Sequence, residues 1–202
     1  MNGYKYTKRS SHPYEPYIPI GATKLIIGTI PPYRFCHKDT NKLFATDVDF
    51  YYGSKDNCFW DIMAEIFNVK LRYINSNDAI KERIEILNLH NIGITDIVKS
   101  CDHKDGKSGD SALENVECKD IVKLLEEHNS ITELIYTSES VKKYMYGEVK
   151  NYHSWDENKI DGKITINGRI YTVKMLYSPS PNALRGVTSE MRISRYRDVF
   201  VF

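Results

Sequence analysis

Short apolar runs alternate with amphipathic segments along the chain. Four of these runs predict buried strands, because each is a stretch of branched apolar residues bounded by turn residues. They cover residues 24–29, 91–98, 131–138 and 170–177. Asn167 and Gly168 lie between alternating apolar runs, which predicts a hairpin leading into the last strand.

Helical spacing of apolar residues marks the segments between the strands. Helices are expected from Asp56 or Asn57 onward, over 77–90, from Leu113 to His128, around Val141–Met145 and over 188–200. In the second of these, Ile80, Ile84 and Leu87 form the expected apolar stripe. Alternating strands and helices predict a mostly parallel sheet with helices on both faces.

The chain of 202 residues suits one domain. The first 20 residues are rich in Tyr and Pro, which predicts an extended arm that wraps the domain. A single domain is expected from residue 21 to residue 202.

Composition and charge limit the possible partners. Apolar residues make up 41% of the chain and charged residues 27%, with no run of 18 apolar residues, so no membrane span is expected. The first residues lack the apolar core of a secretory signal, which indicates a cytoplasmic protein. The net charge is only +1, so any contact with a nucleic acid must come from a local basic face.

The four cysteines form no C-x-x-C pair, which argues against a zinc ribbon and favours unlinked thiols. The six histidines show no metal-ligand spacing either. The sequence therefore predicts neither a metal nor a cofactor.

Functional loops of a parallel sheet leave the carboxyl ends of its strands. Four loops qualify here, over 28–57, 99–112, 137–140 and 177–187. Because the first, second and fourth hold most of the unusual residues, we expect segments 28–33, 51–57 and 177–185 to surround one cleft.

The stretch FYYGSKDNCFW, residues 50–60, combines aromatic rings with a polar turn. Tyr51 and Tyr52 either pack under the helix or remain accessible to a flat ligand. Asn57 is either a helix cap or a polar group of a site. Phe59 and Trp60 belong to the apolar stripe and are expected in the core.

The stretch SPSPNALRG, residues 178–186, forms the last loop. Its prolines hold the backbone extended and leave Ser178 and Ser180 exposed. Leu184 beside Arg185 is either an ordinary exposed leucine or a wedge that enters a base stack next to a phosphate-binding arginine.

Taken in order, GTIPP, YYGSKDNCFW, GITDIV, KSGDSAL and SPSPNALR resemble the uracil-DNA glycosylase superfamily. The resemblance extends from Lys24 to the C-terminus and is greatest to the hypoxanthine-DNA and mismatch-specific uracil-DNA glycosylases. It implies a three-layer α/β/α sandwich around a central, mostly parallel four-stranded sheet. It also implies a monomeric, monofunctional enzyme without a cofactor, acting on DNA that contains uracil, hypoxanthine or xanthine.

The resemblance assigns roles residue by residue. Asn57 falls where the hypoxanthine branch has a catalytic asparagine, and orienting a water suits an amide. Base-binding positions are Tyr52, which would stack on the flipped base, together with Gly28, Thr29, Ile30, Pro31 and Ser178. DNA-binding positions are Ser180, Asn182, Leu184 and Arg185. We also expect Arg192 and Arg195 beside the DNA.

Two departures leave alternatives open. Ile30 stands where many relatives hold the attacking water with Asn or Asp, and Ser178 stands where others have Asn or His. A nucleic-acid- or nucleotide-binding module with weak or no activity, or a hydrolase of a small N-glycoside, therefore remains an alternative. Asp110 and Ser111 match a family segment, but the sequence assigns them no role. The N-terminal C-x-x-C of iron–sulfur relatives is missing, which argues against a cluster.

Overall fold

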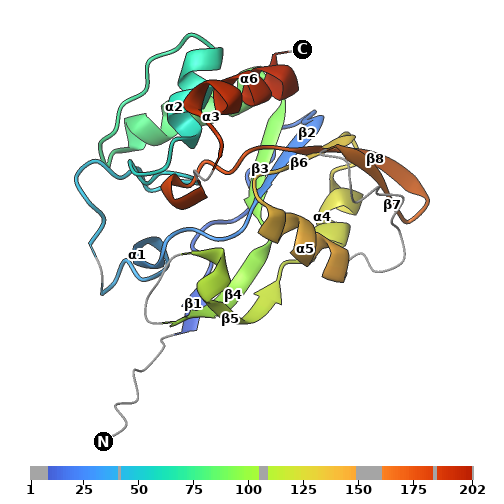
Figure 1. Cartoon of the computed structure of the whole chain (residues 1–202), viewed down its shortest axis with the longest axis horizontal. Helices are drawn as coiled ribbons and strands as arrows, with labels where there is room; N and C mark the ends of the chain where they lie inside the picture. Colours follow the sequence, from blue (N-terminus) through green and yellow to red (C-terminus); the bar gives the residue numbers. More distant parts are fainter. Residues whose placement is uncertain (1–8, 41, 105–108, 149–160, 184–185, 202) are drawn as a thin grey trace, which may run out of the picture.

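A five-stranded sheet forms the centre of the computed structural model, which describes residues 9–40, 42–104, 109–148, 161–183 and 186–201 (Figure 1). Its strands are β2 (Lys24–Gly28), β3 (Ile92–Asp96), β6 (Glu133–Tyr136), β7 (Gly162–Ile166) and β8 (Arg169–Met175), in the order β3-β2-β6-β8-β7. The first four in this order run parallel, and β7 is antiparallel to β8. The mostly parallel sheet is confirmed, but it has five strands rather than four.

The additional strand is the first arm of the predicted hairpin. At its turn Asn167 has φ +48° and Gly168 has φ +77°. Two consecutive positive φ values are what a two-residue type I′ turn requires, and Asn-Gly tolerates them. The hairpin thus places β7 at the edge of the sheet.

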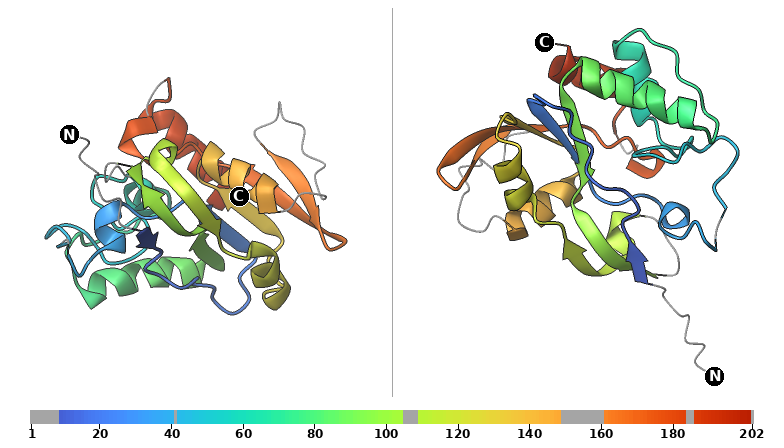
Figure 2. Two further views of the ribbon diagram at one scale, coloured as in Figure 1. Left: turned by 90° about the horizontal axis from the view of Figure 1, so that it is seen from below. Right: turned by 180° about the vertical axis from the view of Figure 1, so that it is seen from behind.

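Helices cover both faces of the sheet (Figures 1 and 2). One face carries α2 (Phe59–Ile66), α3 (Asn77–Leu89) and α6 (Ser189–Phe200), and the other carries α4 (Ile121–Glu127) and α5 (Glu139–Glu148). Ile26 of β2 packs into the core of the first face, whereas Leu25 and Ile27 pack into the second. The alternation of β2 side chains therefore joins two cores into three layers, as predicted.

The predicted stripe of α3 does face the core, where Leu87 is fully buried, but the deepest positions of the helix include others. Ile80 and Ile84 are only partly buried, whereas Ala79 and Arg83 are fully buried. Ser76 caps this helix, because its Oγ accepts a hydrogen bond from the backbone N–H of Ala79. The buried face is set by how the capped helix docks, which periodicity alone does not fix.

A second, three-stranded sheet contradicts two sequence predictions. It consists of β1 (Arg9–Ser11), β4 (Val98–His103) and β5 (Leu113–Cys118), in the order β1-β4-β5. Residues 99–103, expected in a loop, are thus a strand. Residues 113–118, expected as the start of a helix, are also a strand, and α4 begins only after Asp120, whose side chain accepts from the backbone N–H of Lys123.

Residues 9–20 are held against both sheets by backbone hydrogen bonds. Strand β1 pairs with β4, and His12 N donates to Lys99 O over 2.8 Å. Further along, Tyr17 forms an antiparallel bridge with Ile94 of β3. These contacts carry His12 and Tyr14 to the end of the central sheet where β3 stops.

Two further observations concern the cysteines and the helices. The four cysteines are free thiols, as predicted. In the described part of the chain, no helix has both the length and the apolar character needed to cross a membrane.

Candidate active site

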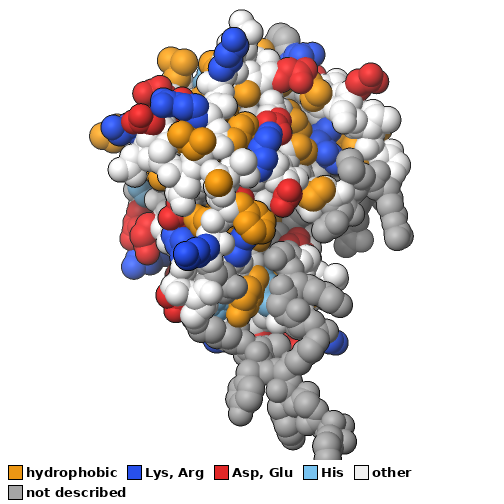
Figure 3. Space-filling view, turned by 90° about the vertical axis from the view of Figure 1, so that its left-hand side faces the viewer, with side chains coloured by type: hydrophobic (Ala, Val, Ile, Leu, Met, Phe, Trp, Pro, Cys, Tyr) orange, Lys and Arg blue, Asp and Glu red, His pale blue; other side chains and the backbone are white. Residues whose placement is uncertain are grey.

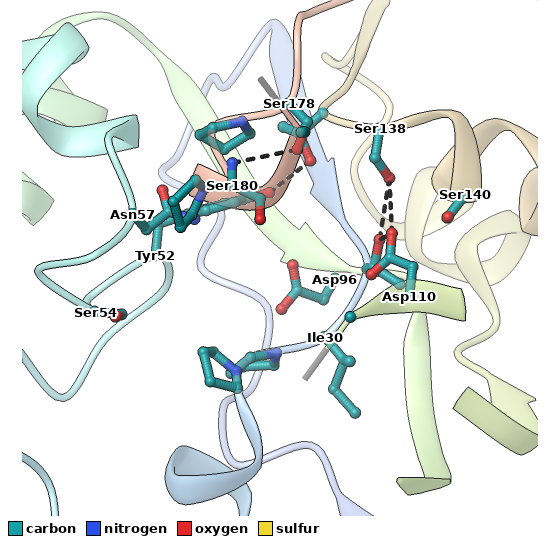
Figure 4. Close-up of a pocket in the computed structure, with 18 of the residues that line it drawn as sticks. Ile30, Tyr52, Ser54, Asn57, Asp96, Asp110, Ser138, Ser140, Ser178 and Ser180 are labelled. Carbon is teal, nitrogen blue, oxygen red and sulfur yellow. Dashed lines mark hydrogen bonds between the residues drawn. The ribbon is translucent and has the colours of Figure 1, made fainter. Parts of the chain in front are cut away.

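A cavity of about 1050 Å³ opens at the carboxyl ends of the parallel strands (Figure 4). Residues that follow β2, β6 and β8 line it, together with Asp96 at the end of β3. Segments 52–57 and 109–112 complete the walls. The three segments expected around one cleft do meet, because parallel strands deliver their following loops to the same edge of a sheet.

Gly28 lies under the cavity, where two polar side chains approach its Cα. A Cβ on this residue would lie 2.1 Å from Asp96 Oδ1 and 2.2 Å from Tyr52 Oη. Neither distance is compatible with a side chain, so only glycine leaves room for both groups. Gly28 shapes the cavity from beneath rather than lining it.

Tyr52 forms part of the wall and is held at its ring and at its hydroxyl. Its ring stacks on Phe59, with centroids 4.3 Å apart and an interplanar angle of 20°. Its hydroxyl lies 2.8 Å from Thr137 Oγ1, at the end of β6. Burial, followed by the charge of Asp96, raises the pKa of Tyr52 well above its usual value, so the hydroxyl stays protonated.

The backbone around Tyr52 is constrained by its neighbours. Tyr52 itself has φ +53°, an uncommon value for a bulky residue. The next residue, Gly53, has no room for a side chain, because a Cβ would lie 1.7 Å from Val48 O. Tyr51 is buried, and its carbonyl accepts a 2.7 Å hydrogen bond from Trp60 Nε1. The tight turn therefore sends Tyr51 into the core and Tyr52 to the cavity.

Asn57 lines the cavity just before α2. Its Oδ1 accepts a 2.9 Å hydrogen bond from Phe59 N. The helix begins at Phe59, three residues later than the earliest predicted start, with Cys58 in the cap position. The amide oxygen of Asn57 thus serves the helix start, which leaves its NH₂ group as a donor for a ligand.

The last loop joins the cavity through Ser178 and Ser180. Ser178 Oγ accepts a hydrogen bond from Ser180 N, which keeps the segment in a compact turn. Between them, Pro179 O accepts from the backbone N–H of Cys58 over 3.1 Å. This bond fixes the loop after β8 against the start of α2, and so sets the width of the cavity.

Thr29, Asp110 and Ser138 form a hydrogen-bonded cluster on another wall, each contributed by a different loop. Thr29 Oγ1 donates to Asp110 Oδ2 over 2.9 Å, and Ser138 Oγ donates to the same oxygen over 3.3 Å. Asp110 therefore ties its loop to the ends of β2 and β6. Ser111 also lines the cavity.

Asp96 and His12 are site residues that the sequence analysis did not single out. Asp96 is 4% exposed and still lines the cavity. Its Oδ2 lies 2.9 Å from His12 Nε2, and both side chains are nearly fully buried. The signal for Asp96 was a carboxylate inside the apolar run predicted over 91–98. No local signal marks His12, 84 residues away in sequence.

Part of the predicted DNA-binding loop, residues 178–186, is outside the described residues. Leu184 and Arg185 fall there, and Asn182 is placed only by its backbone, in a single 3₁₀ turn over Pro181–Ala183. Ile30 and Pro31, by contrast, line the cavity with Thr29.

The prediction for Arg192 and Arg195 is wrong. Arg192 is 4% exposed, and its Nη1 donates to Cys58 Sγ. Arg195 is paired with Asp161 and donates to Met175 O. Both arginines face inward from α6 because they support the strand and helix beneath it.

Charge is mixed around the site. The described lining residues include the carboxylates Asp56, Asp96, Asp110 and Glu139 and one basic side chain, Arg34. Arg34 is itself paired with Asp47, through two bonds of 2.8 and 2.9 Å. On the face seen in Figure 3, Lys and Arg are interspersed with Asp and Glu rather than gathered in one patch. That face therefore gives no broad basic footprint.

The described residues contain no group of three or more His, Cys, Asp or Glu side chains that could hold a metal ion. What the cavity does offer is an aromatic ring, several hydroxyl groups, an amide and a buried carboxylate. Such a set can stack against a flat ring, donate hydrogen bonds to it and hold a water.

The fold is a three-layer α/β/α fold of the uracil-DNA glycosylase-like type. A solution NMR structure with this fold, described as a "putative Uracil DNA glycosylase from Methanosarcina acetivorans", aligns with a TM-score of 0.63. The two chains are 18% identical, and the alignment covers 96% of this chain and 97% of that one. No protein-family model matches the chain, and no curated protein does. At this identity the likeness establishes the fold alone.

Proposed function

We propose that this protein is a monofunctional DNA glycosylase that flips a deaminated base into the cavity and hydrolyses its bond to deoxyribose. Candidate bases are uracil, hypoxanthine and xanthine. The observation that carries the proposal is Tyr52, whose ring is stacked on Phe59 by one face at the wall of the cavity. The opposite face is the one that a flipped base can cover.

Cleavage of an N-glycosidic bond develops positive charge on the sugar and negative charge on the base. The protein must therefore stack the base, donate hydrogen bonds to it and place a water near C1′. Backbone groups from Thr29 to Tyr33 and the hydroxyl of Ser178 are the proposed partners of the base edge. Asn57, with its amide oriented by Phe59 N, is the proposed donor to the water.

Contacts with the DNA strand are assigned to the loop after β8. Ser180 of this loop lines the cavity, and Asn182, Leu184 and Arg185 come after it in the sequence. A polar and basic segment with one apolar side chain suits a strand that must be held while a base leaves the stack.

One observation favours a second candidate, a hydrolase of a small N-glycoside. The described cavity lining has four carboxylates and one arginine. A free nucleoside carries no phosphate, so it would meet less repulsion there than a DNA strand would. The same stacking and water-placing groups would serve that reaction.

Base release separates these functions. The purified protein is incubated with single- and double-stranded DNA containing one uracil, hypoxanthine or xanthine, with undamaged DNA, and with the matching free deoxynucleosides. Our proposal predicts release of the deaminated base from DNA and none from undamaged DNA. Release from the nucleosides alone would establish the second candidate, and DNA binding without release would indicate a binding module.

A further inference from the structure

The most deeply buried carboxylate among the described lining residues of the cavity is that of Asp96. Strand β3 ends at this residue, which pairs in register with Gly28 of β2. Figure 4 shows its carboxylate directed into the cavity, between Asn57 on one side and Asp110 on the other. A carboxylate that is 4% exposed is costly to bury, so its retention at the floor of a cavity requires an explanation.

His12 holds one oxygen of this carboxylate. The ring Nε2 lies 2.9 Å from Asp96 Oδ2. Around Nδ1 lie two donors, Tyr14 N at 3.1 Å and Lys119 Nζ at 3.3 Å, and one acceptor, Tyr14 O at 2.8 Å. An ionised carboxylate can only accept, so Nε2 is the donor of the hydrogen bond to Asp96. Oδ2 is thereby occupied.

The second oxygen has space because residue 28 is glycine. Asp96 Oδ1 and Tyr52 Oη occupy the region where a side chain of residue 28 would be. Tyr52 is the proposed support of the base, so the carboxylate lies close to the group that would stack on it. An oxygen in this position can meet the sugar side of a flipped nucleotide.

Asn57 alone cannot complete the proposed reaction. An amide side chain accepts no proton at neutral pH, and the Asn57 oxygen is already engaged by Phe59 N. Ile30 is apolar and cannot replace it. Among the described lining residues, Asp96 is the most deeply buried carboxylate.

We propose that Asp96 is a catalytic residue of the glycosylase reaction and that His12 is its positioning residue. The inference rests on the proposed function. As the base leaves with the electron pair of the C1′–N bond, Asp96 stabilises the positive charge on the sugar. The water oxygen forms a bond to C1′, and one water proton passes to the free oxygen of Asp96. The base anion takes a proton from solvent, and Asp96 later returns its proton to solvent.

The first test replaces Asp96 with asparagine, which keeps the shape and can still accept from His12. Single-turnover base release from deaminated DNA should fall about a hundredfold or more, with the melting temperature and DNA affinity unchanged. Asp198→Asn makes the same charge change on an exposed residue of α6 outside the cavity and should match the parent. Release by Asp96→Asn within a factor of about three of the parent would overturn the role while leaving the glycosylase proposal intact.

A binding experiment tests the inference even if the parent releases no base. DNA with a cationic pyrrolidine nucleotide mimics the charged sugar, whereas DNA with a tetrahydrofuran nucleotide is its neutral counterpart. The parent should bind the pyrrolidine DNA at least about tenfold more tightly, and Asp96→Asn should lose this preference. Equal binding of the two DNAs by the parent, or an unchanged preference in Asp96→Asn, would count against a cation-facing carboxylate.

The positioning role of His12 is tested by two variants. His12→Ala removes the donor and should lower the single-turnover rate by about tenfold or more without changing DNA affinity. His12→Gln restores a donor at a similar distance and should recover part of the rate. If the two variants lose rate equally, or lose only stability, His12 is a packing residue.

Discussion

The floor and the rim of the cavity are built differently. The floor consists of Gly28, Asp96 and Thr137, each at the end of a parallel strand and each nearly or fully buried. The rim includes Asp56, Gly109, Pro181 and Ala183, which are exposed. Neighbouring groups hold the floor residues closely in position, whereas the rim residues border solvent.

This contrast separates two tasks. A group that must meet a reacting atom has to be held closely, which the strand ends achieve at the floor. A surface that follows a DNA strand can adapt, which suits loops at the rim. We therefore expect floor substitutions to change the rate of base release and rim substitutions to change DNA binding.

Gly28→Ala should have the largest effect. The new Cβ must displace Asp96 or Tyr52, so we expect at least a hundredfold loss of rate and a stability loss of about 1–3 kcal/mol. Single-turnover release and thermal melting measure the two effects. Gly147→Ala in α5 is the matched control, because a Cβ there meets nothing within 4 Å and should leave both quantities unchanged or raise the stability. If Gly28→Ala and Gly147→Ala have the same rate of base release and the same stability, the floor of the cavity has no special role.

Asn57→Ala comes next, because Asn57 stands between floor and rim. If Asn57 orients the attacking water, its loss should raise the activation free energy by roughly 3 kcal/mol, which lowers the rate about a hundredfold. The lost hydrogen bond to Phe59 N should cost only about 1 kcal/mol of stability. Asn57→Asp keeps that hydrogen bond, so its melting temperature should stay near the parent's. If Asn57→Ala releases base at nearly the parent rate but melts lower, Asn57 is a helix cap only.

Tyr52 allows the ring and the hydroxyl to be separated. Tyr52→Phe retains the ring and loses the bond to Thr137, so we expect a stability loss of about 1 kcal/mol with little change in DNA affinity. Tyr52→Ala should weaken binding of lesion DNA by about 1–3 kcal/mol, which titration against lesion and undamaged DNA measures. Equal losses on both DNAs would contradict stacking on a flipped base.

Arg185→Ala should have the smallest effect and should act on binding alone. A lost phosphate contact weakens binding to all sequences alike and lowers the slope of log affinity against log salt by about one. Arg197→Ala removes an exposed arginine of α6 and should leave that slope unchanged. An unaltered slope in Arg185→Ala argues against phosphate contact at that residue.

The central sheet could be predicted because its strands are continuous apolar runs with helices between them. The three-stranded sheet of β1, β4 and β5 could not be predicted from the sequence. Strand β5 reads LENVEC, in which Leu113 and Val116 have helix-like spacing, and the pairing of β1 with β4 joins residues about ninety positions apart. A short polar strand is determined by its distant partner rather than by its own pattern.

The residues of the candidate site also divide into those that could be predicted from the sequence and those that could not. Placing loops at the strand ends was enough to bring Tyr52, Asn57 and Ser178 together in one cavity. The pair formed by Asp96 and His12 depends on where the N-terminal arm passes over the sheets, and the composition of the arm does not specify this. The buried Arg192 was misjudged, although its spacing to Tyr196 and Val199 marks one inward face of a helix.

The most direct test of the account is the chemistry on a DNA duplex with one deaminated base. Free base is measured by mass spectrometry, and the strand is analysed with and without alkali. We predict free base in step with an abasic site that breaks only after alkali, as expected when water attacks C1′. Folded protein that binds the duplex but releases no uracil, hypoxanthine or xanthine above background would contradict the glycosylase assignment.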